Sequence, residues 1–192
     1  MPISPRIVKG ALVRLDGSGD PLAGDALIFQ FNPTELTRRV ERVSRRPPRE
    51  TISFTVEFDA TDAMETLEGN LTVAAHGIYP MLAALESLMH PLTSNVPGWL
   101  EAFLGIGASA GEPPIALFTW GDQRAIPVRL ARLGITEDQH DPALHPLRAT
   151  VNVELSVVTD RDFPKNDSVV QMWRRYVGNL RDMARLGFSR LP

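Results

Sequence analysis

Cysteine is absent from this sequence of 192 residues, which excludes disulfide bonds, thiolate metal ligands and cysteine nucleophiles. A chain without cysteine fits a reducing compartment, so we expect a cytoplasmic protein. No apolar run reaches the length of about 18 residues that a membrane-spanning helix requires. The amino-terminal residues also lack the apolar centre of a secretion signal. From the residues alone, we expect a chain that folds in water.

An excess of positive charge is also missing. The formal net charge is −3 at pH 7, which argues against general attraction to nucleic acid or to anionic membranes. Hydrophobic residues make up 43% of the chain and charged residues 22%, which is the balance of a globular protein with a real core. We expect a β domain over residues 1–160, followed by a helical extension over residues 161–192.

The motifs of the common enzyme classes are missing too. The sequence contains no G-x-S-x-G, P-loop, G-x-G-x-x-G or H-E-x-x-H pattern. Asp138, His140, Asp141 and His145 lie close together, but their spacing fits no zinc or calcium pattern, and Pro142 favours a turn. We therefore expect no enzymatic activity, no bound metal and no cofactor.

Period-two alternation of apolar and polar residues is the clearest positive signal. It runs through residues 149–157 and again through residues 51–59, and each run predicts a strand that is buried on one face. Shorter strands are expected over residues 7–15 and 26–31, separated by a Gly- and Asp-rich turn. These patterns predict a mainly β protein.

The central feature of the predicted fold is a long antiparallel hairpin. Residues 126–133 form one strand, which follows a turn at Trp120-Gly121-Asp122, and residues 149–157 form the other. The polar residues 134–148 lie between them. We expect these polar residues to form a protruding loop.

Two helices are expected, over residues 77–89 and 167–186. The first is expected to pack on the sheet. The second is amphipathic, and its stripe containing Trp173 and Tyr176 either docks on the sheet of the same chain or packs on a neighbouring subunit. The sequence leaves both options open. The connection over residues 91–114 carries Trp99 and Phe103, which favours contact with a partner.

Residues 34–49 are rich in arginine, although the chain is acidic overall. This segment is either a solvated strand and loop, or a charged contact surface or pore-facing strip. An RNA-binding arm is disfavoured because no aromatic residues alternate with the arginines. The candidate interface residues of the whole chain are Arg38, Arg39, Arg42, Arg45, Trp99, Phe103, Asp138, His140, Trp173 and Tyr176.

Several motifs, in this order, resemble a known family. They are FQFNPTEL (residues 29–36), FTVEFDATD (54–62), HGIYPMLAALESL (76–88), FTWGDQRAIPVRL (118–130) and ITEDQHDPALHPLRATV (135–151). Together they resemble the tube-like domain of contractile injection systems, which are phage-tail-derived particles with a sheath, an inner tube and a baseplate. The resemblance covers roughly residues 7–158.

This resemblance implies a β-sandwich or split barrel of the phage tail-tube type with one packed helix and a carboxy-terminal helix. It also implies a homo-oligomeric ring, expected to be a hexamer, that contacts the inner tube protein, the spike or hub protein and other baseplate proteins. The most similar members are baseplate components that initiate the tube. Some carry a LysM module that binds peptidoglycan, but this chain ends in an amphipathic helix, so that role is not transferred.

The expected product is therefore a structural protein that is assembled into a phage tail-like particle, whose release from the cell is left open. We expect it to bind no nucleic acid and to insert into no membrane. One alternative is a tube terminator or cap adaptor at the opposite end of the particle. An alternative of another class is a small-molecule-binding β-barrel with the segment around Trp99 as its lid.

Overall fold

The computed structural model describes residues 8–16, 19–61, 71–90, 113–163 and 167–188. These residues form a mainly β protein with a carboxy-terminal helix, as the sequence predicts. The strands are β1 (Ala11–Leu15), β2 (Pro21–Ile28), β3 (Leu36–Glu41), β4 (Arg49–Asp59), β5 (Ala116–Thr119), β6 (Ala125–His140) and β7 (Pro146–Val157), and the helices are α2 (Leu71–His76), α3 (Tyr79–Ser87) and α5 (Ser168–Phe188).

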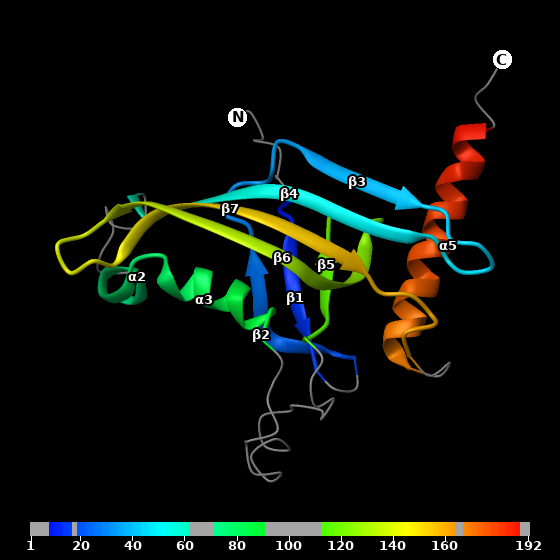
Figure 1. Ribbon diagram of the computed structural model, residues 1–192, viewed down its shortest axis with the longest axis horizontal. Coiled ribbons are helices and arrows are strands. Elements are labelled where there is room, and N and C mark those ends of the chain that lie inside the picture. Colours follow the sequence, from blue (N-terminus) through cyan, green and yellow to red (C-terminus); the bar gives the residue numbers. More distant parts are fainter. Residues whose placement is uncertain (1–7, 17–18, 62–70, 91–112, 164–166, 189–192) are drawn as a thin grey trace, which may run out of the picture.

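All strands belong to one antiparallel sheet with the order β2-β1-β5-β6-β7-β4-β3. The sheet folds over at β6, because β5 pairs with Ala125–Val128 at its start and β7 pairs with the rest. We call β3, β4, β7 and β6 the long layer and β2, β1 and β5 the short layer. Figure 1 shows the short layer crossing behind the long one, with α5 upright at one end.

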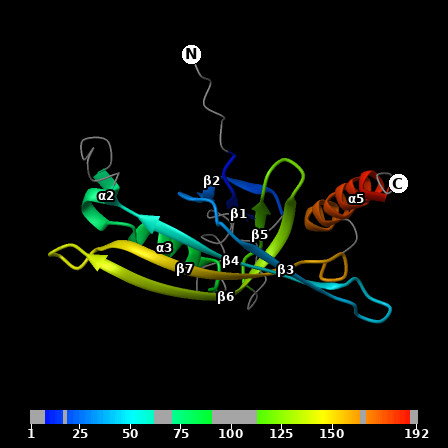
Figure 2. The same ribbon diagram turned by 90° about the horizontal axis from the view of Figure 1, so that it is seen from above.

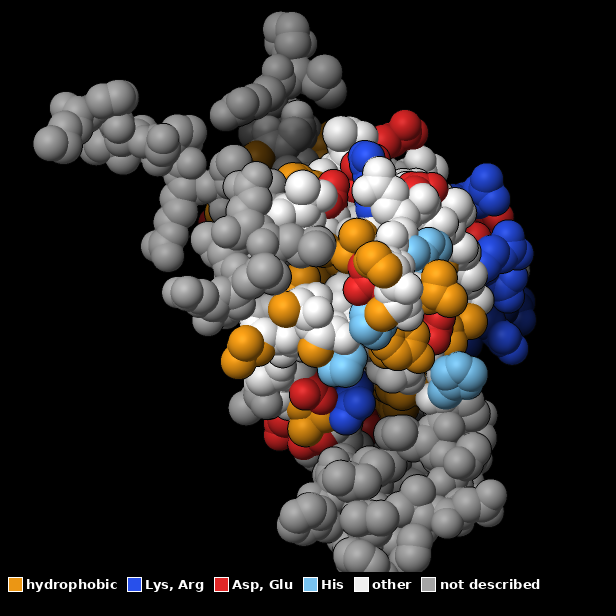
Figure 3. All heavy atoms as spheres, turned by 90° about the vertical axis from the view of Figure 1, so that its left-hand side faces the viewer, with side chains coloured by type: hydrophobic (Ala, Val, Ile, Leu, Met, Phe, Trp, Pro, Cys, Tyr) orange, Lys and Arg blue, Asp and Glu red, His pale blue; other side chains and the backbone are white. Residues whose placement is uncertain are grey.

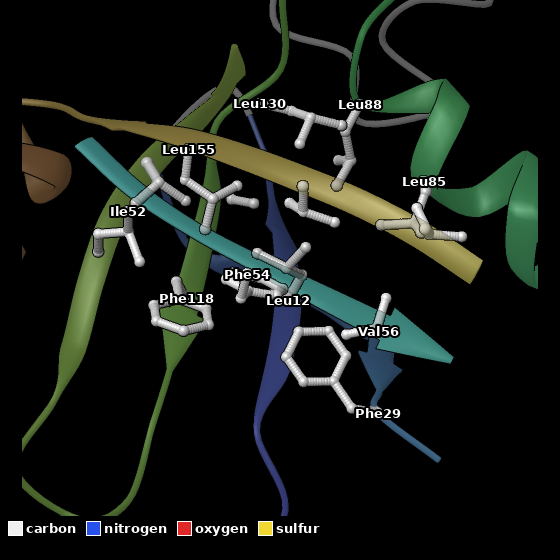
Figure 4. Close-up of a cluster of buried hydrophobic side chains, with 14 of the residues drawn as sticks. Leu12, Phe29, Ile52, Phe54, Val56, Leu85, Leu88, Phe118, Leu130 and Leu155 are labelled. Atoms are coloured by element: carbon white, nitrogen blue, oxygen red, sulfur yellow. The ribbon is translucent and has the colours of Figure 1, made fainter. Parts of the chain in front are cut away.

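The core lies between these two layers (Figure 4). The Phe54 ring of β4 stacks on Phe118 of β5 at a centroid distance of 5.4 Å, and it lies 5.5 Å from the Phe29 ring that follows β2. These rings come from strands that are not neighbours in the sheet, so the sheet must curl to bring them together. In β4 and β7 every second side chain is buried, which gives the long layer one apolar face. The short layer packs against this apolar face.

The end of β2 corrects one sequence prediction. The strand predicted over residues 26–31 ends at Ile28, and side-chain amides then replace the backbone pairing. The Gln30 side chain donates to the Asp59 carbonyl (2.8 Å) and accepts from the Asp59 amide (2.9 Å), which ties this segment to the end of β4. Asn32 accepts from the Gly10 amide and donates to the Val8 carbonyl, at 2.9 Å each. The sequence pattern does not show where the strand ends, because amide side chains can form hydrogen bonds with backbone groups in place of a neighbouring strand.

The helix predicted over residues 77–89 is present as α3, and α2, which the sequence analysis did not predict, precedes it. Gly77 separates them with a φ of 58°, and a Cβ there would lie 2.1 Å from the Pro146 carbonyl oxygen. The Ile78 amide donates to this same carbonyl at 2.8 Å. Glycine therefore lets the helix pair dock against the end of the hairpin, where β7 begins. Leu82 and Leu85 of α3 join the core, as expected.

The long hairpin is confirmed, but its loop is much shorter than predicted. Strand β6 continues to His140 and β7 begins at Pro146, so residues 134–140 and 146–148 are paired rather than looped. The hairpin end extends beyond the body, as Figure 2 shows. Beyond Ile135, the side chains of β6 are exposed on both faces, so polar residues occupy both faces and the alternation is lost. Polarity was therefore mistaken for a loop.

The carboxy-terminal helix is confirmed with slightly different bounds. Its first half docks on the sheet through Val169, Val170 and Tyr176, which are all buried. The helix was predicted to end at residue 186, but it continues to Phe188, so Gly187 lies inside it. The residues from 91 to 112, which include most of the predicted long connection, lie outside the described part of the chain.

Candidate interface

The border strand β3 carries the first part of the arginine-rich segment. On the described strands, β3 pairs with β4 only, so its other edge has no strand beside it. Arg39 and Arg42 are exposed, and so is Arg45 in the turn that leads to β4. The Arg45 carbonyl accepts a hydrogen bond of 2.7 Å from Arg161 Nη2. The segment thus contains both a strand and a turn, and its free cationic groups point to solvent.

Arg38 differs from its neighbours because its side chain turns inward. It lies opposite Ile52 of β4, and its guanidinium reaches the carboxylate of Glu50, with Nε 2.8 Å from Oε1. Its Nη2 also donates to the hydroxyl of Tyr176 on α5 at 2.6 Å. This hydroxyl in turn lies 3.0 Å from each Glu50 oxygen. Arg38, Glu50 and Tyr176 therefore join the border strand, its neighbour and the helix in one polar cluster.

Burial decides the electrostatics of this cluster. The Glu50 side chain is only 9% exposed and that of Arg38 is 28% exposed. Burial, together with the negative charge of Glu50 and against the opposing effect of Arg38, raises the pKa of Tyr176 to about 12. Burial alone would lower the pKa of Arg38, but the hydrogen bond and the charge of Glu50 outweigh it, so this pKa is raised. The phenol is therefore a neutral donor at ordinary pH, and the guanidinium is charged.

Two of the candidate interface residues, Arg38 and Tyr176, thus contact each other inside one chain. Glu50 was not among the candidates, although the sequence contains a signal for it. Glu50 precedes Ile52 and Phe54 in the inward-facing positions of β4. A charged residue in such a row predicts a buried partner of opposite charge.

The opposite border of the long layer is the outer part of β6. Strand β5 pairs with β6 only as far as Val128, so the edge beyond it has no partner among the described strands. Asp138 is exposed there, at an irregularity in the pairing with β7. His140 is also exposed, and its Nε2 lies 3.0 Å from Glu137 Oε2. The outer end of this border carries the acidic groups Glu137 and Asp138, whereas Arg132 is exposed nearer the body and β3 carries arginines.

The hairpin end is held by Asp141. Its Oδ1 accepts from the amides of Ala143 and His145 at 2.8 Å each, and its Oδ2 lies 2.8 Å from His145 Nδ1. The backbone hydrogen bond from His145 is the largest cause that lowers the pKa of Asp141. The His145 ring also lies 6.2 Å from that of His76, edge to face. Histidine and apolar side chains gather on this end of the molecule (Figure 3).

No group of three or more potential metal ligands occurs among the described residues. Of the four residues that the sequence analysis considered, His145 pairs with Asp141, whereas His140 pairs with Glu137, which was not one of the four. Among all the residues that the structure describes, no helix has both the length and the apolar character needed to cross a bilayer.

The outward face of the long layer is polar. Thr37, Ser53, Glu154 and Arg132 lie side by side across β3, β4, β7 and β6. In the next row, Thr55 donates to Asn152 at 2.9 Å. These two rows border a hollow of about 580 Å³. The side chains that form these two rows are polar.

The remaining candidate among the described residues, Trp173, lies on helix α5. Trp173 is half-buried and packs against the main core. Farther along the same stripe, Leu180 and Met183 are 49% and 46% exposed. The two options that the sequence left open therefore divide the helix, since its first half docks on its own sheet and its second half does not.

Trp99 and Phe103 lie outside the described residues. The interface roles of all ten candidates stay predictions. A scan against models of known protein families found no match, and a search of curated proteins found no significant similarity.

Proposed function

We propose that this chain is a structural, non-catalytic component of a contractile injection system. In this proposal, identical copies form a ring, expected to be a hexamer, that joins the inner tube to the baseplate or spike. The resemblance of five motifs to the tube-like domains of such particles is the basis for proposing this class of particle. The two borders of the long layer that have no partner among the described strands provide the physical argument.

The observation that carries the proposal is the pair of free edges. An exposed strand edge presents unpaired backbone groups and is a liability unless another chain pairs with it. Among the described strands, β3 leaves one edge without a partner and the outer part of β6 leaves the other, at opposite borders of the same layer. Because the strands alternate in direction across this layer, β3 of one copy would meet β6 of the next in the antiparallel sense.

The charges of the two borders favour this pairing. Arg39 and Arg42 are exposed on and beside β3, whereas Glu137 and Asp138 are exposed on β6. Opposite charges across a strand pair are favourable, and like charges are not. Complementary borders also disfavour pairing of β3 with another β3. The surface therefore favours a head-to-tail ring over a symmetric dimer.

The positions of the two edges along the strand direction are consistent with a closed barrel. Through β4 and β7, Leu36 lies level with Leu133, and Arg39 lies level with Arg129. The part of β6 that carries Glu137 and Asp138 lies beyond this level, so a neighbour must shift along the strands to bring the β3 arginines opposite these carboxylates. Tilted strands in a closed barrel have such a stagger.

The polar outward face gives a second support. In a ring built this way, one face of the long layer lines the lumen and the other remains against the core. The face with Thr37, Ser53 and Asn152 suits water, while its reverse contains Phe54 and Val153. The role would then be mechanical, because extended interfaces hold the ring in register and no chemical step is needed.

Ring formation is testable with a charge exchange. The variant Arg39→Glu/Arg42→Glu should abolish assembly, measured by native mass spectrometry at low ionic strength, because it places acidic groups opposite Glu137 and Asp138. Combining it with Glu137→Arg/Asp138→Arg should restore assembly. Arg174→Glu/Arg175→Glu on the exposed side of α5 is the matched control and should assemble normally. Arg38 is not used, because it belongs to the buried cluster.

The absence of cysteine allows a direct check of the contact. A chain with Arg39→Cys and Glu137→Cys should give disulfide-linked multimers that end at a closed ring. Each single-cysteine chain should stop at a dimer. A wild-type chain that remains a monomer at all concentrations would refute the ring.

The position in the particle needs a separate experiment. Particles assembled without this protein should contain baseplates that carry no tube, if the chain initiates the tube. Tubes of uncontrolled length would instead indicate a terminator or cap adaptor at the opposite end.

A further inference from the structure

A second hollow, of about 250 Å³, lies at one end of the long layer. One wall is the turn between β3 and β4, and the other is the loop that follows β7. The floor comes from β6 and β7. Its lining residues are Val43, Arg46, Pro47, Pro48, Arg49, Arg129, Ser156, Val157, Val158, Thr159, Arg161 and Asp162.

The charge of this hollow is strongly one-sided. Four arginines line it, at positions 46, 49, 129 and 161, against the single carboxylate of Asp162. This carboxylate is already occupied, since its Oδ2 accepts from the amide of Thr159 at 2.7 Å and from its hydroxyl at 3.0 Å. Like charges gathered in a small space repel one another, and a bound anion relieves that repulsion.

The walls of the hollow are fixed before any ligand binds. Arg161 Nη2 donates to the Arg45 carbonyl at 2.7 Å and ties the two loops together. The Arg129 guanidinium lies over the Phe163 ring, 5.4 Å from its centroid. The Val158 amide donates to the Pro127 carbonyl at 2.9 Å, which anchors the start of the second loop. Loops tied in this way lose little backbone freedom when a ligand binds.

Arg46 and Arg49 supply the cationic groups that remain free for a ligand. Both are exposed, and no ion pair joins either of them to another described residue. Planar guanidinium groups bind tetrahedral oxyanions through paired N–H donors. The Ser156 hydroxyl on the floor adds a neutral donor.

We propose that this arginine-lined hollow is a binding site for a polyvalent oxyanion of the phosphate type. Such a ligand carries enough charge and enough acceptor atoms to engage several guanidinium groups at once. A simple carboxylate has one charge and two oxygens, so it can satisfy only part of the set. This site goes beyond the proposed ring and does not depend on it.

Inorganic phosphate is the probe. Calorimetric titration and thermal melting of the full chain should show saturable binding of phosphate near neutral pH, with a raised melting temperature. Sodium chloride and sodium acetate at matched ionic strength should have no comparable effect. Acetate binding as tight as phosphate binding would overturn the assignment to a polyvalent anion.

Variants locate the site. Arg46→Gln and Arg49→Gln should each weaken phosphate binding about tenfold, because each removes a charge-assisted hydrogen bond. Arg132→Gln is the matched control, since its side chain is 80% exposed on the same layer but outside the hollow. It should leave the affinity unchanged. Melting in chloride checks that each variant folds, and Arg49→Lys, which keeps the charge but not the fork, should bind with intermediate affinity.

Two results would overturn the proposal. One is a wild-type chain that shows no saturable response to phosphate beyond that to chloride. The other is an equal loss of affinity in Arg132→Gln, which would indicate attraction to surface charge in general. Amide NMR shifts centred on residues 156–162 would instead support it.

Discussion

The two halves of helix α5 carry the same apolar stripe but have different surroundings. In the first half, Val169 and Tyr176 are 3% and 5% exposed. In the second half, Leu180 and Phe188 are 49% and 78% exposed. Figure 1 shows the reason, because the helix extends past the β3–β4 turn and leaves the sheet behind. A periodic pattern therefore shows which face of a helix is apolar, but not how much of it the same chain covers.

The difference also separates two kinds of stabilisation. The first half is held by apolar contacts and by the cluster of Arg38, Glu50 and Tyr176, which reaches across to the border strand. The second half has no comparable contact with the sheet among the described residues. Substitutions in the two halves should therefore have very different effects on the free energy of unfolding.

The largest effect is expected from breaking the buried ion pair. Arg38→Met leaves the Glu50 carboxylate buried without its cationic partner, and it should lower the free energy of unfolding by about 2–4 kcal/mol. Urea denaturation measures this change. The double variant Arg38→Met/Glu50→Met replaces both partners with apolar groups and should recover most of the loss. If it is no more stable than the single variant, the pair is not the cause.

Val169→Ala should have the next largest effect. It removes two methyl groups from a side chain that packs with Leu15 and Val158 in a small cluster, and it should cost about 2 kcal/mol. Leu180→Ala on the exposed half is the matched comparison. Equal losses in the two variants would mean that the halves do not differ as described.

Tyr176→Phe should cost about 1 kcal/mol at neutral pH, because it removes hydrogen bonds to charged groups. It should also change the pH dependence. The pKa of Tyr176 rises from 10.0 to about 12 on folding, so the folded chain holds the phenol proton more tightly than the unfolded chain does. The resulting stability is complete below pH 10 and is lost as the pH rises toward 12.

Denaturation of both chains across this alkaline range measures the effect. The wild type should lose stability more steeply than Tyr176→Phe between pH 10 and 12. Parallel curves would indicate that the phenol proton is not retained by the cluster.

The smallest effect is expected from Leu180→Ser/Met183→Ser. Both side chains are about half exposed, so the free energy of unfolding of the isolated chain should change by no more than about 0.5 kcal/mol. Thermal melting of the monomer at low concentration measures this. A loss as large as that of Val169→Ala would mean that this part of the stripe is covered.

Much of the fold was visible in local patterns. Hydrophobic periodicity and the turn residues between elements depend only on neighbouring residues. They were enough to predict the alternation in β4 and β7, the pairing of β6 with β7 and both helices. The pattern failed at the hairpin end, where the side chains of β6 are exposed on both faces. It also failed after Ile28, where Gln30 takes over the pairing through its side chain.

The candidate interface was visible only in part. The density of arginine in residues 34–49 singled out the segment, but it could not show that Arg38 turns inward while Arg39 faces solvent. That choice depends on the pairing of β3 with β4 and on Tyr176, which is 138 positions away from Arg38 in the chain. The hollow lined by arginines was not predicted at all, because its walls come from three separate segments.

By itself, the sequence determined the alternating parts of β4 and β7 and the apolar faces of α3 and α5, since helix and strand periods are properties of consecutive residues. Only the tertiary structure decided which arginines pair with groups of the same chain and which sheet borders have no partner among the described strands. It also decided where along α5 the apolar stripe stops being covered by the sheet. These features depend on contacts between residues far apart in the chain. No local pattern records such contacts, because they form only when the sheet folds over at β6.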